Sequence, residues 1–237
     1  MRLFKKTFMV LALAAAFSMV LPAVGTSAET AAASTNVYYT DSGIVDGYHR
    51  LVINTGSGNI TTAVNKAALA AKSGATDSVK YMIVIPSGSY TISKAIYLYS
   101  NTYLYADGAY VKRPGGGPML RNGTTKSGGG YSGDRNITID GGTWNGDAKH
   151  AKKNFSIAKF AHGKNFVLKN LTLTNDAGAH HVEFGGINGI RITNCRFTNL
   201  YRLKGKKSTV GQEAVQFDIT NKTGFVGYTP YDDTVYM

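Results

Sequence analysis

The chain has 237 residues, enough for one domain with a sizeable core, and 26 Lys and Arg against 14 Asp and Glu give it a formal charge of +12. Its single cysteine excludes an internal disulfide, so packing alone must stabilise the fold. The basic residues cluster in loops without interleaved aromatic side chains, which argues against nucleic acid. Acidic glycans, anionic membrane surfaces or a merely solvated basic face remain consistent with the charge.

Residues 1–28 have the pattern of a signal peptide. Three basic side chains lie within the first six residues, an apolar run covers residues 8–20, and small residues lead to a cleavage position after Ala28. The apolar run is short for a membrane span. We therefore expect an exported, secreted protein, with a net charge of +9 after cleavage and no transmembrane segment.

Two segments precede the main body of the chain. Residues 29–57 show no convincing pattern and are predicted to be a flexible N-terminal segment. NITTAVNKAALAAKSG follows, in which Asn59 can begin a helix and Gly74 can end it. Apolar residues recur on one face of that helix, namely Ile60, Val64, Ala67, Ala68 and Ala71.

The rest of the chain is rich in short β-type runs. YMIVIPSGSYTI, NFVLKNLTLTN and GIRITNCRFTN are examples: apolar and polar residues alternate over four to six positions, and Gly, Asn or Asp separate the runs. No helix is expected among them. Residues 58–237 are accordingly predicted to be one all-β domain with a short capping α-helix at its N-terminal end.

A repeat specifies the architecture more closely. A shift of 24 residues superimposes Phe160 on Phe184, Phe166 on Ile190, Leu168 on Ile192, Asn170 on Asn194 and Leu173 on Phe197. A third line fits after an insertion, with Ile139 and Trp144 at apolar positions. Stacked units of this size that contain strands and no helix predict a parallel β-helix.

The same alignment assigns individual side chains. Cys195 takes the position of Leu171, so it is predicted to be a small core residue and not a nucleophile. Trp144 also takes a core position. Asn170 and Asn194 lie where the chain must turn sharply, and asparagine tolerates the left-handed conformation, so a stacked pair is expected there.

One exposed face of the predicted sheet could carry chemistry. Placing Phe160, Phe184 and Phe217 inward leaves Ile157, Lys159, His181, Glu183, Ala214 and Gln216 facing solvent, with Asp218 beyond them. Adjacent rungs can place carboxylates at the ~5–9.5 Å separations that glycoside hydrolysis uses. A purely solvated polar face, with Lys159 and Glu183 as an ordinary ion pair, is the structural alternative. The catalytic candidates are Glu213, Asp218, Glu183 and His181, and the substrate-binding candidates are Lys159, Gln216, His180 and Arg202.

The chain also resembles a known group of proteins. A cap helix, then YMIVIPSGSYTISKAIYLYSNTYLYADGAYVKR and NITIDGGTWNGD, is similar to the start of the pectate lyase superfamily and, within it, of the polygalacturonase-like family 28 glycoside hydrolases. The similarity covers about Asn59 to Asp218. It implies a right-handed parallel β-helix and a polysaccharide substrate, with hydrolysis of an acidic or pectin-like glycan as the activity.

The catalytic motif of that family is not intact. Glu213-Ala214-Val215-Gln216 aligns with its Asp-Gly-Ile-Asp, so Glu213 keeps a carboxylate while Gln216 replaces the second one. The Gly-Asp-Asp of the next rung has only Asp232-Asp233 to match it, without the glycine. The last residues contain no capping element, which favours a chain truncated at its C-terminal end.

Three functions stay open. The first is a secreted glycosidase, the second a non-catalytic wall-binding or adhesion module that uses the same face, and the third a polysaccharide lyase. No cofactor or metal is expected, except Ca²⁺ for the lyase. The predicted partner is a polysaccharide or cell-wall glycan, and the protein is expected to be a monomer.

Overall fold

The computed structural model describes residues 34–56, 58–123, 130–203 and 212–220. The proposed signal peptide and Asp232-Asp233 lie outside them. Within these ranges the protein is mostly β, with one α-helix, α1 (Thr61–Gly74), and one 3₁₀ turn, η1 (Ala148–His150). The strands are β1 (Ser34–Thr35), β2 (Tyr39–Val45), β3 (Tyr48–Ile53), β4 (Lys80–Val84), β5 (Gly88–Thr91), β6 (Ile96–Leu98), β7 (Thr102–Tyr105), β8 (Ala109–Lys112), β9 (Leu120–Asn122), β10 (Arg135–Asp140), β11 (Thr143–Asn145), β12 (Ala158–Lys169), β13 (Thr172–Thr174), β14 (Val182–Thr193), β15 (Arg196–Thr198) and β16 (Val215–Asp218).

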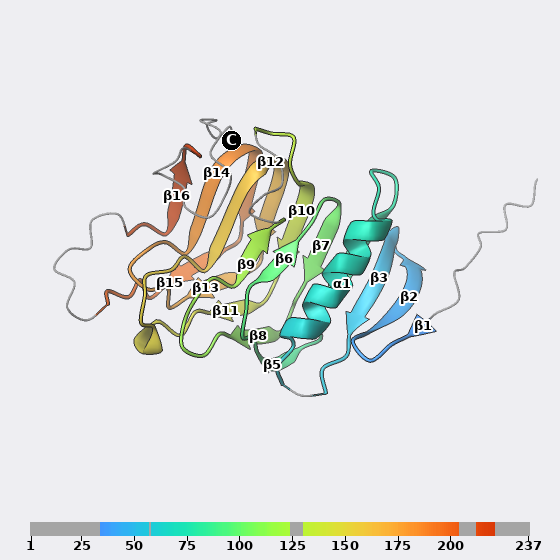
Figure 1. The fold of residues 1–237 in the computed structure, drawn as a ribbon, viewed down its shortest axis with the longest axis horizontal. Coiled ribbons are helices and arrows are strands. Elements are labelled where there is room, and N and C mark those ends of the chain that lie inside the picture. The colour runs from blue at the N-terminus through green and yellow to red at the C-terminus, as the bar shows by residue number, and fades with distance from the viewer. Residues whose placement is uncertain (1–33, 57, 124–129, 204–211, 221–237) are drawn as a thin grey trace, which may run out of the picture.

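The strands form two curled sheets that are mostly parallel (Figure 1). The first runs in the order β1-β2-β3-β4-β7-β10-β12-β14-β16, with β6 and β9 branching from β12. The second runs β15-β13-β11-β8-β5. The long strands β12 and β14 each contain a bend that divides them into two parts. The first part of β12 pairs with β9 and its second part pairs with β10. The left-handed residues His162 and Gly186 mark the two bends.

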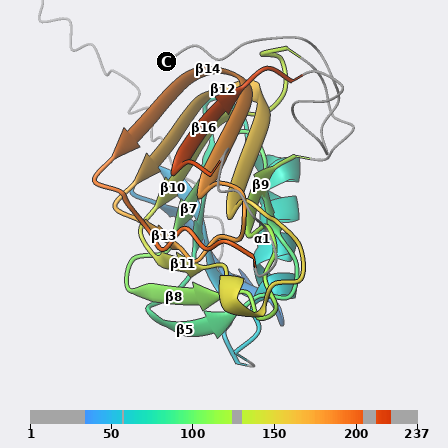
Figure 2. The same ribbon diagram turned by 90° about the vertical axis from the view of Figure 1, so that its left-hand side faces the viewer.

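The register confirms the 24-residue repeat. Phe160 pairs with Phe184, Phe166 with Ile190 and Leu168 with Ile192 in β12 and β14, and Leu173 pairs with Phe197 in β13 and β15. The third line is confirmed as well, since Ile139 pairs with Leu168 and Trp144 with Leu173. Figure 2 shows β10, β12 and β14 lying side by side along this repeat. Each unit buries its apolar side chains against its neighbours.

Asparagines line the turns between units, as predicted. Asn170 and Asn194 have φ of 55° and 52°, and the Asn194 amide donates to Oδ1 of Asn170 at 2.9 Å. Asn170 in turn donates to the Asp140 carboxylate at 2.8 Å. A second stack joins Asn101, Asn136 and Asn165, again all with positive φ. These amides bond one unit to the next at turns where few other residue types adopt the backbone conformation.

The core lies between the sheets. Phe160 and Phe184 are fully buried with ring centroids 5.7 Å apart, and Phe217 continues the stack at 5.8 Å. Phe217 was expected to be buried, but it is 39% exposed because β16 is the outermost strand of this part of the sheet. Trp144 is fully buried, and Cys195 packs half-buried against the core with its thiol directed at backbone carbonyls.

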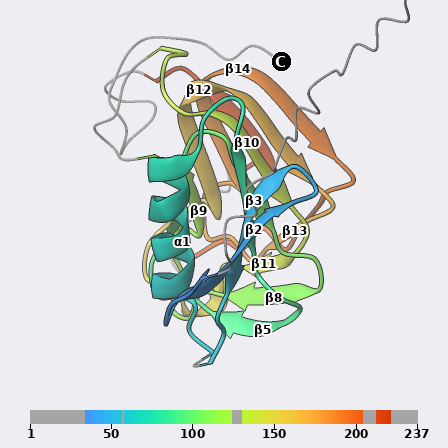
Figure 3. The ribbon, with the colours of Figure 1, turned by 90° about the vertical axis from the view of Figure 1, so that its right-hand side faces the viewer.

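Helix α1 covers the N-terminal end of the stack (Figure 3). It buries the predicted apolar face, and the Asn59 side chain accepts a hydrogen bond from the amide of Thr61 at 3.1 Å. The segment before it is not loose as expected: β2 and β3 form an antiparallel hairpin, and β3 pairs in parallel with β4. The alternation of residue types in YHRLVI, the sequence of β3, could have predicted this strand. No helix among the described residues has the length and apolarity to cross a bilayer.

Candidate functional site

The strongest cluster of polar side chains lies on the outer surface of the first sheet. Tyr97, Arg121, Lys159, Glu183 and Gln216 occupy equivalent positions on β6, β9, β12, β14 and β16 and pair one to the next. We call these five residues the charged ladder. Its last three members were predicted from the repeat. Arg121 was missed because the short strand β9 stands in a glycine-rich stretch outside the repeat.

An ion pair sits at the centre of the charged ladder. The Lys159 ammonium lies 3.0 Å from Oε2 of Glu183, and the Ser156 hydroxyl donates to the same oxygen at 3.1 Å. Only 8% of Glu183 is exposed. Both partners have lost most of their hydration, so removing one would leave a buried charge without its counter-ion. The predicted pairing of Lys159 with Glu183 is present, but it is more deeply buried than a surface ion pair.

His180 connects this pair to Glu213. Its Nδ1 lies 3.0 Å from a carboxylate oxygen of Glu213, and its Nε2 lies 3.9 Å from Glu183. The Glu213 side chain is 49% exposed and that of Glu183 only 10%. The imidazole therefore lies within 4 Å of both carboxylates. The structure thus joins three of the predicted site residues in one arrangement.

His181 does not belong to the outer face, contrary to the prediction. It is 1% exposed, its Nε2 donates to the carbonyl of Thr198 at 2.7 Å, and its ring packs on Phe197. Ile157, at the equivalent position, is also fully buried although it was predicted to face solvent. Both residues precede their strands, at a corner where the strict alternation of a strand does not apply.

The remaining predicted residues lie around the charged ladder. Gln216 pairs with Glu183 as expected, and Asp218 lies two residues further along β16, half-buried and opposite Gly185. Arg202 is exposed on the loop after β15, at the end of the second sheet, and is not a member of the charged ladder. Ala214 is half-buried just before β16.

Asp176 is a functional candidate that the sequence did not reveal. It is completely buried, and its carboxylate lies 3.6 Å from Nε2 of His181. Neither carboxyl oxygen has a hydrogen bond of normal geometry among the described residues. Burial raises the pKa of Asp176 to about 7, opposed in part by the nearby amide of Ala179. Burial likewise lowers the pKa of His181, opposed by its bond to Thr198. The sequence around Asp176, TNDAG, has the composition of an ordinary turn, so it did not indicate a buried carboxyl group.

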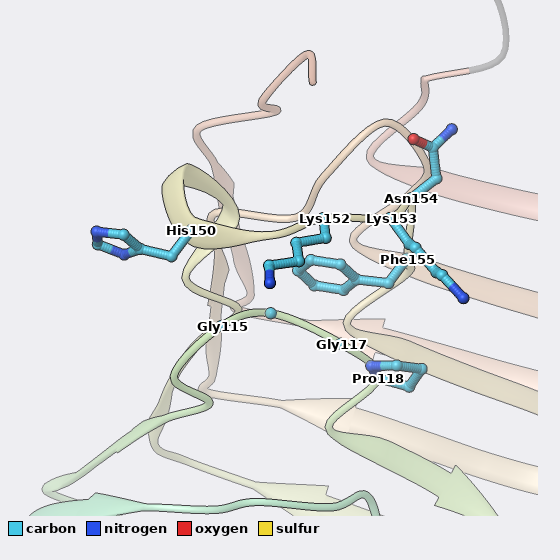
Figure 4. A pocket seen from close by; sticks show the side chains of 9 residues that line it. Gly115, Gly117, Pro118, His150, Lys152, Lys153, Asn154 and Phe155 are labelled. Atoms are coloured by element: carbon cyan, nitrogen blue, oxygen red, sulfur yellow. The ribbon is translucent and has the colours of Figure 1, made fainter. Parts of the chain in front are cut away.

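The charged ladder borders a groove made of two hollows. One, of about 300 Å³, is lined by side chains that include Arg121, Ser156, Lys159 and Glu183. The other, of about 380 Å³, is lined by Gly115–Pro118 together with His150, Lys152 and Lys153 (Figure 4). Both are lined by Pro118, Asn154 and Phe155, so they adjoin one another. We call the two hollows together the basic groove.

Figure 4 shows how the second hollow is built: the side chains of Lys152 and Phe155 project above the backbone at Gly115. Phe155 is 7% exposed and gives the hollow an apolar floor, while the lysines at its rim are exposed. Gly116 must be glycine here, because its φ is 79° and a Cβ would stand 2.6 Å from that of Ala151. No group of three or more His, Cys, Asp or Glu among the described residues is arranged to hold a metal ion.

Comparison with known proteins gives a fold and no family. No protein-family model matches the sequence, and no curated protein sequence does. Two solved structures of PfbA, a surface adhesin of Streptococcus pneumoniae, match 75% of this chain, with TM-scores of 0.58 and 0.60 and identities of 18% and 20%. The matched part corresponds to 43% and 47% of those adhesin chains. At this identity the similarity shows a shared fold only.

A weaker similarity is to a "putative glycosyl hydrolase" from Parabacteroides merdae. It has a TM-score of 0.44 and 13% identity over 68% of this chain and 90% of that one. At this score the similarity supports no inference. The assignment of a function must therefore come from the site itself.

Proposed function

We propose that this chain is an exported right-handed parallel β-helix of the pectate lyase type and that it binds an acidic polysaccharide in the basic groove. One observation carries the proposal. The hollow beside the charged ladder, which Arg121 lines, adjoins the hollow lined by Lys152 and Lys153, so these three cations border neighbouring parts of the basic groove. A linear polymer with regularly spaced carboxylates fits such a row of cations.

The chemistry of the groove favours a sugar polymer over other anions. Phe155 and Pro118 form an apolar floor against which the C–H faces of sugar rings can pack. Asn154, which is exposed and lines both hollows, supplies an amide that can hydrogen-bond to sugar hydroxyl groups. The net charge, which is +9 without the three basic residues of the proposed signal peptide, draws acidic polymers toward the protein. The fold shared with a protein named as a surface adhesin is compatible with a binding role.

A second candidate function is hydrolysis of the bound glycan. The observation in its favour is the Glu213–His180–Glu183 arrangement, in which one carboxylate is half-exposed and the other is paired with Lys159. Glu213 would protonate the leaving oxygen, and Glu183 would activate water or attack the sugar. Gln216, which stands where the related hydrolases carry a carboxylate, favours binding without cleavage. A lyase reaction has less support, since it would need Lys159 as a base and this lysine is held by Glu183.

Binding is tested by calorimetry with a defined oligogalacturonate and with its uncharged methyl ester, using protein from Glu29 onward. We expect the acid form to bind and the ester to bind weakly. Replacing both Lys152 and Lys153 by Gln should weaken the interaction about fivefold to tenfold, because two rim cations are lost. Replacing Lys66 and Lys94 removes the same charge from exposed positions outside the groove and should have little effect. Equal losses in the two double variants would contradict the proposal.

Cleavage is tested in the same samples. New reducing ends that disappear in Glu213→Gln would establish hydrolysis, and Asp218→Asn shows whether the more distant carboxylate takes part. Unsaturated ends would indicate a lyase. Binding without products would leave the binding function alone.

A further inference from the structure

A second groove lies on the same sheet, beyond the bends in β12 and β14. It consists of two hollows of about 180 and 560 Å³, and the side chains that define it include Tyr48, Tyr103, Thr138, Asn165, Lys169 and Arg191. Both hollows are lined by Tyr103, Thr138, Asn165 and Val167, so they adjoin one another. We call this the tyrosine groove. It shares no lining residue with the basic groove.

The pairing of strands aligns this groove across the sheet. Arg50, Met82, Tyr103, Thr138, Val167 and Arg191 occupy equivalent positions on β3, β4, β7, β10, β12 and β14. Adjacent strands are about 4.8 Å apart, so this row of side chains crosses the sheet with a spacing comparable to the length of one sugar unit in a polysaccharide. An arginine stands at each end of the row.

Tyr103 is held rigidly at the centre. Its hydroxyl donates to the Asp140 carboxylate at 2.5 Å, the ring of Tyr48 meets it edge-on at 5.4 Å, and the Lys169 ammonium lies 5.4 Å from its ring centre. Asp140 is 7% exposed. Its carboxylate also accepts a hydrogen bond from the Asn170 amide and forms an ion pair with Lys169 at 3.3 Å. Asp140 therefore fixes the aromatic wall, and Lys169 balances its charge.

The charge of the lining specifies the ligand. Among the described residues that line either hollow, Lys80, Lys169 and Arg191 are cationic and none is acidic. One edge carries the amides of Asn101, Asn136 and Asn165, which can hydrogen-bond to hydroxyl groups. Aromatic walls, amides and the exposed cations Lys80 and Arg191 together suit a sugar chain that bears carboxylates.

We propose that the tyrosine groove is a second, separate binding site for an acidic oligosaccharide, so that one molecule holds two glycan chains or two stretches of one chain. The inference does not require the basic groove to work, because the two sites have no lining residue in common. Two such sites on one protein would cross-link an acidic matrix through avidity.

The test is calorimetry with the oligogalacturonate and the methyl ester described above. The intact protein is expected to bind two acid oligosaccharides. Arg191→Glu reverses one exposed charge in the tyrosine groove and should weaken one of the two sites about fivefold to tenfold. The matched control is Arg196→Glu, an exposed arginine on β15 in the other sheet, which should leave both sites unchanged.

The outcomes separate this site from the basic groove. A single site that responds to the Lys152 and Lys153 double variant, and not to Arg191→Glu, would overturn the inference and leave the proposed function standing. A single site that responds only to Arg191→Glu would support the tyrosine groove and contradict the proposed binding in the basic groove. Equal binding of the acid and the methyl ester in the tyrosine groove would overturn the acidic ligand class. Circular dichroism of each variant verifies that the fold is retained.

Discussion

Two buried polar residues, Asp176 and His181, lie directly behind the candidate site. They contact each other at 3.6 Å, and His181 is adjacent in sequence to His180, which links the two glutamates. Burial acts on both in the direction of the neutral form: it raises the pKa of Asp176 to about 7 and lowers the pKa of His181. A buried carboxyl of this kind makes stability depend on pH.

Asp176→Asn should stabilise the protein at neutral pH but not at acid pH. Between about pH 4 and pH 7 the folded protein holds a proton on Asp176 that the unfolded chain has released, so the contribution of Asp176 to stability falls as the pH rises through this window. Asn cannot titrate, so the variant should gain up to a few kcal/mol over the parent by pH 7. Burial lowers the pKa of His181, so its own contribution to stability changes with pH in the opposite direction.

The measurement is urea denaturation of both proteins at a series of pH values. The difference in unfolding free energy should grow from pH 4 to pH 7 and then level off. A difference that stays constant with pH would show that Asp176 does not titrate in this range.

At the scale of the elements, α1 closes one end of the stack. Without it the apolar ends of the first strands would face water, and a stack of repeats needs a cap at its end. Its inner face is completely buried at Val64, Ala67, Ala68 and Ala71, whereas Leu69 on its outer surface is 46% exposed. Packing, more than helix propensity, therefore holds this helix in place.

Two substitutions to Asp in α1 distinguish the effect of side-chain burial on stability from the effect of helix propensity. Ala67→Asp introduces a carboxylate into a fully buried position and should lower the free energy of unfolding by roughly 3 kcal/mol or more. Leu69→Asp, two residues along the same helix, should change it by about 0.5 kcal/mol. Urea denaturation followed by circular dichroism measures both. Similar losses would mean that helix propensity, and not capping of the stack, decides the stability.

Viewed as a whole, the molecule has two separate grooves that cations line, the basic groove and the tyrosine groove. The charged ladder and the tyrosine groove use the two parts of the same long strands, β12 and β14, on either side of their bends. The chain as a whole has 26 basic and 14 acidic side chains, so its field favours acidic polymers over much of its surface.

Salt should therefore weaken the binding of an acidic glycan. The Debye length falls to about 8 Å at physiological ionic strength and further above it, which screens the exposed cations of both grooves. Calorimetry over a series of sodium chloride concentrations should show a progressive loss of affinity for the oligogalacturonate and a nearly constant, weak affinity for its methyl ester. A salt-independent affinity for the acid form would show that the cations do not carry the binding.

The repeat, the asparagine turns and the capping helix could be predicted from the sequence because each rests on a local pattern. A period of 24 residues fixes which side chains stack, and alternation within a strand fixes that Phe184 faces inward and Glu183 outward. That reasoning failed at the corners, where Ile157 and His181 both point inward, and at Phe217, whose exposure depends on what lies beside β16.

The sequence by itself therefore determined the units of this protein, their register, most of its core and the order Lys159–Glu183–Gln216 along one face. Only the tertiary structure decided which loops meet that face: it brings Arg121 beside Lys159 and joins Gly115–Pro118 to Lys152 and Phe155 in one groove. The physical reason is that a stack repeats only its strands. The loops between them differ in length and composition, so their contacts over long sequence separations follow from packing and leave no periodic signal.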